Sequence, residues 1–381
     1  MMTPMRIEDF ALERFFARYE FAVRHLLCAS DVEGWPMADL LALADAESLA
    51  LWHGLRLGYT EAPGHPLLRT EIARLYEMVE PDDVLVFSGA EEAIFVTSNV
   101  LLGPGDHAVV TWPAYQSLHE VARATGADVT LLELHAGDGW ALDPDALRRA
   151  LTPRTRLVVV NVPHNPTGAL PDAATYRAVV DLAGDAGATL LSDEVYRFLE
   201  LDPADRLPAG ADAAPHVASL GVMSKSFALA GLRIGWLATH DRGLLDRVVR
   251  FKDYTTICAS APAEILSLIA LRARGEVLAR SRGIVAANLA CLDPFFERQA
   301  AHLRWVRPRG GSIAFPELTA DVPIDRFVED LLEAEGVLLA PGSIFGHPGN
   351  HFRLGFGRTD LPAALERLEA FVTRTLGTGS A

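Results

Sequence analysis

The chain has 381 residues, of which 50% are hydrophobic and 22% are charged, a composition typical of a soluble globular protein. Its 34 basic and 50 acidic residues give a formal charge of −16, which argues against nucleic acids and anionic membranes as partners. A chain of this length exceeds the usual size of one hydrophobic core, so we expect a large and a smaller domain.

The cysteines are few and far apart. Cys28, Cys258 and Cys291 form no C-x-x-C pair, so the sequence predicts no metal site and no disulfide framework. The N-terminal segment mixes acidic with apolar residues and does not resemble a signal peptide. No apolar run approaches membrane-spanning length. We therefore expect a cytoplasmic protein that acts on small molecules.

Short apolar runs alternate with segments of helical period. One such segment, 171–187, places Tyr176, Val179, Val180 and Leu182 on a common face. This alternation predicts an α/β fold in which a mostly parallel sheet is sandwiched by helices. The runs predicted as strands are VLVFSG (84–89), HAVVTW (107–112), RLVVVNV (156–162), TLLSDE (189–194), VASLGV (217–222) and IGWLAT (234–239).

The pattern changes after about residue 285. Helices are predicted near 285–300 and 324–335 and from residue 361, with a strand at 337–341. We expect these elements to form a smaller α+β domain together with the N-terminal residues. The predicted division is 46–285 for the large domain and 1–45 plus 286–381 for the small one.

Polar residues end several predicted strands, where ligands bind in parallel sheets. In SGAEEA (88–93), small residues precede a helix, so the amides of Gly89, Ala90 and Glu91 can point at an anion or simply start the helix. Asn165 in PHNPTG can end a strand. Asp193 in SDEVY either caps a helix or meets a cation, because a buried carboxylate is otherwise costly.

Only two lysines occur, Lys225 and Lys252, and all other basic residues apart from histidine are arginine. Unlike arginine, a lysine amine can lose its proton in a suitable site and attack a carbonyl. An anion-binding turn, a carboxylate for a ring cation and a reactive amine together fit one ligand. Pyridoxal 5′-phosphate (PLP) has the phosphate, the ring nitrogen and the aldehyde that these groups require.

With these residues, the chain resembles the fold-type I PLP-dependent enzymes of the class I/II, aspartate aminotransferase-like family. The resemblance runs from about Tyr59 to Arg353. It implies PLP as the cofactor and transfer of an α-amino group from an L-amino acid to a 2-oxo acid. The motifs that carry it are SGAEEA (88–93), GPGD (103–106), PAY (113–115), PHNPTG (163–168), SDEVY (192–196), SK (224–225), GLRIGW (231–236), PGSIFG (341–346) and FRL (352–354).

The resemblance implies a role for each catalytic position. Lys225 would hold the cofactor as an internal aldimine and later move the proton between the substrate's α-carbon and C4′ of the cofactor. Asp193 would pair with the pyridine N–H. Asn165 and Tyr196 would hydrogen-bond to the phenolic oxygen.

The phosphate would be bound by a second group of residues. Arg233, eight residues after the lysine, would clamp it together with Ser88 and the amides of Gly89, Ala90 and Glu91.

Three further positions complete the implied site. Tyr115 would stack on the cofactor ring, with core packing as the alternative, since the neighbouring Trp112 could stack instead. Tyr59 would reach the phosphate of a neighbouring subunit, which implies a homodimer. Arg353, together with Asn165, would bind the substrate, with Arg353 gripping its α-carboxylate.

The sequence departs from the family in two places. Val222 stands where family members carry a serine or threonine that binds the phosphate, so we expect one contact fewer. Near the N-terminus, LLCASDVEGWPM (26–37) replaces a glycine-rich segment that lines the substrate side chain. Asp31 or Glu33 either belongs to a solvated loop or faces the cleft, where it would meet a cationic substrate.

Three other residues have expected structural roles. We expect His164 to be a buried structural histidine and Arg358 to be a surface residue. Lys252 is expected to cap a helix or to pair with an acidic neighbour, and a place at the dimer cleft is the alternative.

Cofactor motifs do not choose the reaction, because PLP labilises several bonds at the α-carbon. Transamination is the leading prediction. The alternatives are β- or γ-elimination and ring formation of the kind that capreomycidine synthase performs. A non-catalytic PLP-binding regulator is disfavoured, since the N-terminus leaves no room for a DNA-binding module.

Overall fold

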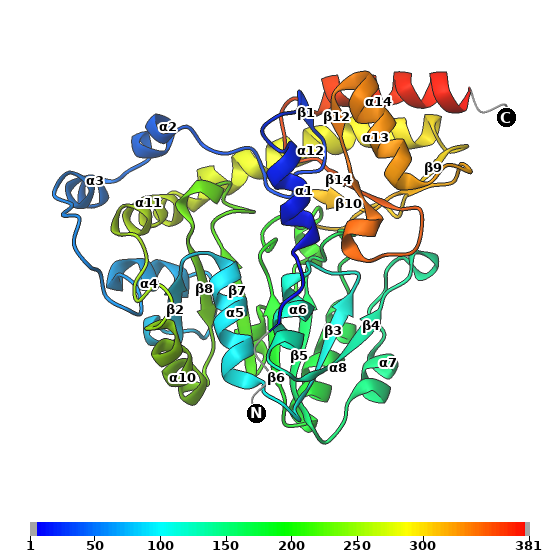
Figure 1. Ribbon diagram of the computed structural model, residues 1–381. Helices are drawn as coiled ribbons and strands as arrows, with labels where there is room; N and C mark the ends of the chain where they lie inside the picture. The colour runs from blue at the N-terminus through cyan, green and yellow to red at the C-terminus, as the bar shows by residue number, and fades with distance from the viewer. Residues whose placement is uncertain (1–5, 378–381) are drawn as a thin grey trace.

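A seven-stranded sheet forms the centre of the larger part of the computed structural model, which describes residues 6–377 (Figure 1). Its strand order is β2-β8-β7-β6-β5-β3-β4, and only β8 runs antiparallel to its neighbours. The predicted mostly parallel α/β sheet is therefore confirmed. Its strands are β2 (Val84–Phe87), β3 (His107–Trp112), β4 (Asp128–Glu133), β5 (Thr155–Asn161), β6 (Thr189–Asp193), β7 (Val217–Val222) and β8 (Gly235–Ala238).

All six predicted runs form strands, but β4 was missed. This strand lies at the edge of the sheet, and among the described residues it pairs only with β3. Its residues are mostly exposed or half-buried, and acidic residues stand at both ends. An edge strand of this kind lacks the continuous apolar run on which the prediction of buried strands rests.

Helices cover both faces of the sheet because successive strand residues point in opposite directions. Ala108 and Val110 pack with α5, α6 and α10 on one face, whereas Val109 packs with α7 and α8 on the other. The segment predicted at 171–187 forms α8, with Leu182 only partly buried. These helices are α5 (Ala90–Leu101), α6 (Ser117–Ala124), α7 (Pro144–Ala150), α8 (Ala173–Asp185) and α10 (Arg242–Lys252).

Four helices pack beyond the β2 and β8 edge of the sheet, on the left in Figure 1. Trp236 of β8 contributes to this cluster, and its indole N–H donates to the hydroxyl of Tyr76 at 2.8 Å. Among residues 6–377, no helix combines the length and the apolarity needed to cross a membrane. These helices are α2 (Met37–Ala42), α3 (Ala46–His53), α4 (Pro66–Ala73) and α11 (Ala261–Arg272).

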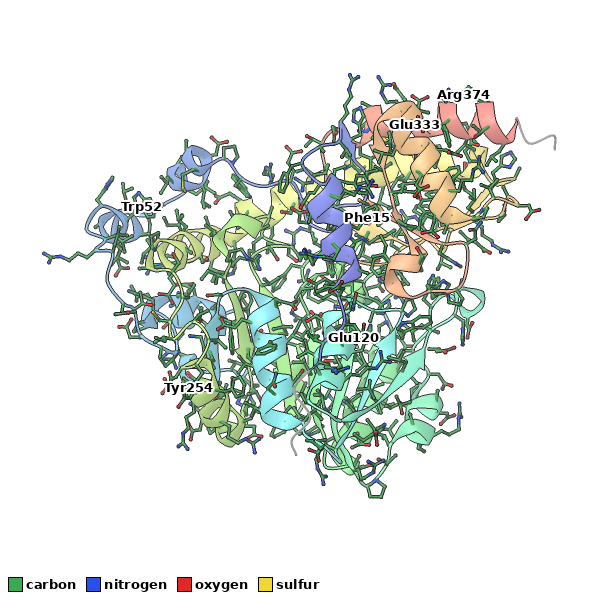
Figure 2. The ribbon with its side chains drawn as sticks, in the orientation of Figure 1. Phe15, Trp52, Glu120, Tyr254, Glu333 and Arg374 are labelled. Atoms are coloured by element: carbon green, nitrogen blue, oxygen red, sulfur yellow. The ribbon has the colours of Figure 1, made fainter. Side chains whose placement is uncertain are left out.

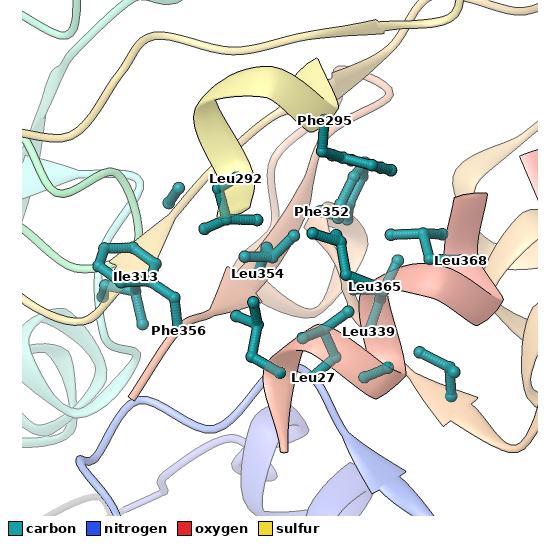
Figure 3. Close-up of a cluster of buried hydrophobic side chains, with 14 of the residues drawn as sticks. Leu27, Leu292, Phe295, Ile313, Leu339, Phe352, Leu354, Phe356, Leu365 and Leu368 are labelled. Atoms are coloured by element: carbon teal, nitrogen blue, oxygen red, sulfur yellow. The ribbon is translucent and has the colours of Figure 1, made fainter. Parts of the chain in front are cut away.

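The smaller part has its own hydrophobic cluster, in which Leu27 joins apolar residues from 285 onward (Figure 3). The long helix α12 runs from the larger part into this one (Figure 1). The predicted boundary at residue 285 falls inside α12, so the proposed division into two domains stays a prediction. The elements of this part are α12 (Arg274–Arg298), α13 (Ile324–Glu335), α14 (Leu361–Leu376), β9 (Leu303–Arg304), β10 (Ile313–Ala314), β11 (Glu317–Leu318), β12 (Val337–Leu338), β13 (Ala340–Pro341) and β14 (Phe352–Gly355).

The N-terminal segment joins the two parts. Strand β1 (His25–Leu26) pairs in parallel with β12, and helix α1 (Ala11–Tyr19) extends from the smaller part toward the sheet (Figure 1). After β1, the chain passes very close to β14. A Cβ atom added at Gly355 would lie 1.9 Å from the carbonyl oxygen of Ala29, so only glycine permits this approach.

Gly355→Ala should destabilise the protein by about 1–3 kcal/mol, because the backbone at Ala29 must move away. The free energy of unfolding in denaturant measures this change. Gly275→Ala is the matched control: Gly275 lies in α12 with open space where a methyl group would be added, and alanine there should stabilise by about 0.4–1 kcal/mol. Equal stability of the two variants would contradict the packing described at Gly355.

Candidate functional site

A cavity of about 340 Å³ opens where β5, β6 and β7 end. Asn161, Asp193 and Val222 are the last residues of these strands, and all three line it. The parallel strands bring their carboxyl ends to one edge, where loops can carry functional side chains. Eight residues of the predicted site line this cavity: Ala90, Glu91, Tyr115, Asn165, Asp193, Tyr196, Lys225 and Arg233.

Lys225 follows β7 and points into the cavity. Its ammonium donates a hydrogen bond to the hydroxyl of Ser30 at 2.7 Å, and it lies 5.8 Å from the ring centre of Tyr196. The pKa of Lys225 is lowered from 10.5 to about 8, mainly because burial removes the charged amine from water. The negative charge of Asp31 raises this pKa, and the positive charge of Arg353 lowers it. An amine with this pKa is partly neutral near neutral pH, as a nucleophile or a base must be.

Asp193 ends β6 and is buried. One carboxylate oxygen accepts from the amide of Val195 at 3.2 Å, and the main-chain carbonyl of Asp193 accepts from the side chain of Asn161 at 2.9 Å. Burial raises the pKa of Asp193 to about 7. Asp193 forms no ion pair with any residue in the described range 6–377, so a cationic N–H in the cavity would satisfy it.

The start of α5 lies against Arg233. Gly89 precedes the helix with φ +90°, and an added Cβ would lie 2.7 Å from a guanidinium nitrogen of Arg233. No side chain of the described residues caps this helix, which leaves the first amides free for an anion. The amide of Ser88 is already used, since it donates to Glu92 at 2.7 Å.

Val222 and Ser224 also line the cavity close to this helix start. The side chain at position 222 is apolar, so it offers no hydrogen bond to a ligand. Ser88 does not line the cavity, and its predicted contact with the phosphate stays a prediction.

Arg353 of β14 is fully buried. Its Nε donates to the carbonyl of Cys28 at 3.1 Å, and Nη1 donates to the side-chain oxygen of Asn165 at 3.4 Å. The rings of Phe16 and Phe345 lie 5.7 and 5.3 Å from its guanidinium carbon. Within residues 6–377, Nη2 has no hydrogen-bond partner, so this buried cation is prepared for an anion.

The hydroxyl of Tyr196 is a second polar group at the site without a hydrogen-bond partner among the described residues. This hydroxyl is buried and lines the cavity. Burial raises the pKa of this hydroxyl above its usual value, so it stays protonated and can donate.

Tyr115 lines the cavity, but its ring packs on Phe10 with ring centres 5.0 Å apart. Its hydroxyl donates to Glu13 at 3.4 Å. Trp112 is not part of the lining and instead stacks on His347 with ring centres 5.6 Å apart. Of the two aromatic residues considered for stacking on the cofactor, only Tyr115 therefore lies at the cavity.

Sequence reasoning missed the wall that α1 provides. Leu12, Glu13, Phe16 and Glu20 line the cavity from this helix. The spacing of Glu13, Phe16 and Glu20 places them on one helical face, and this spacing was the available signal. Ala29, Ser30 and Asp31 extend the wall.

Of the two acidic residues near the N-terminus, only one faces the cavity. Asp31 lines the cavity and also accepts from Arg358 at 3.0 and 3.1 Å. Glu33 points elsewhere, where it accepts from the amide of Thr359 at 2.9 Å. Arg358, expected to be a surface residue, is 29% exposed, and its ion pair with Asp31 keeps the rest of its side chain buried.

His164 and Lys252 lie outside the cavity, and only His164 has the surroundings that the sequence predicts. His164 is buried and contacts the hydroxyl of Thr167 at 2.8 Å, in agreement with a structural role. Lys252 is also buried, but it donates to the carbonyls of Ala62 and Ile257 at 3.0 and 2.6 Å and to no carboxylate of residues 6–377. Of the roles expected for Lys252, the acidic partner is wrong, and the place at the dimer cleft stays a prediction.

Comparison with known proteins places the chain in the family "aminotransferase class I and II", which it matches over residues 27–368. The chain belongs to this family, whose members depend on PLP, and it is an enzyme of the PLP-dependent aminotransferase class.

Three relatives illustrate the range of this similarity. Capreomycidine synthase of Streptomyces vinaceus is 32% identical over 98% of this chain and 93% of its own length. A PLP-dependent aminotransferase from Streptococcus suis has a TM-score of 0.92 and 31% identity over 97% of this chain and 99% of its own. The PLP-dependent cyclase OrfR has a TM-score of 0.88 and 32% identity over 98% and 99%.

The acetylation rate of Lys225 in the cofactor-free protein should report its lowered pKa. The amine is protonated below pH 8 and neutral above it, so the rate should rise about tenfold per pH unit up to about 8 and then level off. Acetic anhydride labelling followed by peptide mass spectrometry measures this profile. A rate that continues to rise toward pH 10, as for an ordinary lysine, would contradict the burial described for this amine.

Proposed function

We propose that Lys225 binds PLP covalently and that Asp193, Tyr196 and Asn165 hold its ring. The chemistry of the cavity supports this: a buried amine with a pKa of about 8, a buried carboxyl without a cationic partner among residues 6–377, and a buried hydroxyl free to donate. A pyridine N–H and a phenolic oxygen would satisfy the last two groups.

Arg233 and the free amides of Ala90 and Glu91 would hold the phosphate, at the place where Gly89 permits close approach. Tyr115 would cover one face of the ring. Because Val222 supplies no hydroxyl, the phosphate would be held with one hydrogen bond fewer than in family members with serine or threonine there.

The bound cofactor would withdraw electrons from the substrate's α-carbon. Arg353 would bind the substrate's α-carboxylate through its unused Nη2, with Asn165 beside it, and so orient the α-carbon toward Lys225. Lys225 would then take the proton from the α-carbon as a general base and return it as an acid. The buried Nη2 of Arg353, which has no hydrogen-bond partner within residues 6–377, is the observation that carries this proposal.

Transamination is the reaction that we propose, with an L-amino acid as donor and a 2-oxo acid as acceptor. Membership of the aminotransferase family supports it, as does the likeness to the Streptococcus suis aminotransferase. Ring formation or elimination is the second candidate, favoured by the similarity to capreomycidine synthase and to the cyclase OrfR. Identities of 31% and 32% do not separate the two classes.

We also propose that the protein is a cytoplasmic homodimer in which Tyr59 reaches the partner's phosphate site. Tyr59 is 89% exposed and does not line the cavity of its own chain. Leu57 and Tyr254 are also large exposed side chains, and Figure 2 shows Tyr254 at the surface near α10, which supports a partner in this region. Lys252 links the segments that follow these two residues, through Ala62 and Ile257. A solution mass of one 41.2 kDa chain would contradict the dimer.

Product analysis distinguishes the candidate reactions. A single turnover of the PLP-loaded enzyme with an L-amino acid should release a 2-oxo acid and leave pyridoxamine phosphate. Ammonia and a 2-oxo acid with unchanged PLP would indicate elimination, and a cyclic product with unchanged PLP would indicate ring formation. Either result would contradict transamination.

Lys225→Ala should lower the rate of this reaction at least about 10²–10⁴-fold, because the base is removed. The variant retains Lys252, so it tests the position of the amine rather than its presence in the chain. Turnover by Lys225→Ala at the wild-type rate would overturn the assignment of Lys225.

A further inference from the structure

The cavity has an acidic wall, which we define as Glu13, Glu20 and Asp31. Glu13 and Glu20 come from α1 and its C-terminal end, and Asp31 comes from the segment after β1. All three line the same cavity as Lys225. None of them has a part in the proposed binding of PLP or of the α-carboxylate.

Contacts with the larger part of the protein fix the position of this wall. The amide of Ala11 donates to the side chain of Gln116 at 2.9 Å, and Gln116 in turn donates to the carbonyl of Asp9 at 2.8 Å. Phe10 packs on Tyr115, and Phe16 lies against the guanidinium of Arg353. Helix α1 therefore forms a built side of the cavity, next to the residue proposed to bind the α-carboxylate.

The negative charge of the wall is only partly neutralised. Asp31 pairs with Arg358, but neither Glu13 nor Glu20 forms an ion pair within residues 6–377. Burial raises the pKa of Glu20, and the negative charges of Asp31 and Glu13 raise it further, whereas Arg358 and Lys225 lower it. Mutual repulsion of this kind is relieved when a cation enters between the carboxylates.

The cations already at the cavity do not satisfy the wall. Lys225 donates to Ser30 and has a pKa of about 8, so its charge is lost as pH rises through that value. Arg233 lies at the place proposed for the phosphate. Arg353 does not itself line the cavity, but it donates to the lining residue Asn165 at 3.4 Å and is the group proposed for the α-carboxylate. The buried hydroxyl of Tyr196, without a partner among the described residues, independently indicates that this cavity receives a ligand.

From these contacts we propose that the acidic wall selects amino acids whose side chain ends in a cation, a guanidinium or an ammonium. This inference rests on the proposed function, because it takes Arg353 as the site of the α-carboxylate. With that end held, the side chain extends within the same cavity, and its cationic end meets Glu13, Glu20 and Asp31. Dicarboxylic amino acids are repelled by the same charges.

The test compares pairs of amino acids that have nearly the same shape and differ in charge. L-Arginine and L-citrulline form one pair, and L-lysine and L-norleucine form the other. Each is titrated into the PLP-loaded enzyme, and the dissociation constant is taken from the change in the absorption band of the bound cofactor. The cationic member of each pair should bind at least about tenfold more tightly, as expected for a charge–charge interaction in a partly buried site.

Variants then assign the preference to the wall. Glu20→Gln and, in a separate protein, Glu13→Gln should each reduce the ratio of citrulline to arginine dissociation constants severalfold. Glu33→Gln is the matched control: it removes the same charge two residues from Asp31, but Glu33 does not line the cavity, and the ratio should stay at the wild-type value. The use of two wall variants keeps the test decisive if one of them does not fold.

The outcomes separate this inference from the proposed function. If every amino acid changes the absorption band but charged and neutral members bind equally, the inference is wrong and the proposed function stands. The same holds if aspartate or glutamate binds more tightly than arginine and lysine. If the ratio falls as much in Glu33→Gln as in Glu20→Gln, the wall is not the source of the preference. If no amino acid changes the band, the proposed function itself fails.

Discussion

The removal of the Lys225 amine from water is the constraint on which the site depends. An amine exposed to water would be fully protonated near neutral pH, whereas burial brings its pKa to about 8. Two groups of residues provide that burial: those at the ends of β6 and β7, and the N-terminal residues of the cavity lining, which include Ser30. Neither group of residues buries Lys225 alone, so the environment of this one amine depends on segments as far apart in the sequence as α1 and β7.

The sheet and the smaller part contribute different groups to the cavity. The larger part supplies Asp193 and Lys225 from adjacent parallel strands, and β14 of the smaller part supplies Arg353. Asn165 contacts Arg353 and thereby joins the two contributions at one point. The result is a cavity with groups for an anion at the start of α5 and for a cation along α1, while Arg353, bonded to the lining residue Asn165, is the group proposed for an α-carboxylate.

Much of the fold and most of the candidate site could be predicted from the sequence. Six strands were recognisable as buried apolar runs, and Asp193 and Lys225 were recognisable because polar residues at the ends of such runs are unusual. Strand β4 was not recognisable, because it lies at the edge of the sheet, where its residues alternate between more and less exposed positions and carry charge. The ion pair of Asp31 with Arg358 and the role of α1 depend on contacts between residues that are 327 and 102 positions apart, which local patterns do not encode. The distinction between Asp31 and Glu33 has the same origin, since a difference of two positions decides which carboxylate faces the cavity.

The presence of only two lysines makes the central claim directly measurable. Reduction of the PLP-loaded protein with sodium borohydride renders the bond between lysine and cofactor permanent, and peptide mapping by mass spectrometry then locates it. The structure predicts one label per chain on Lys225 and none on Lys252, whose amine is held by two backbone carbonyls. A label on Lys252, or no label on either lysine, would contradict the account.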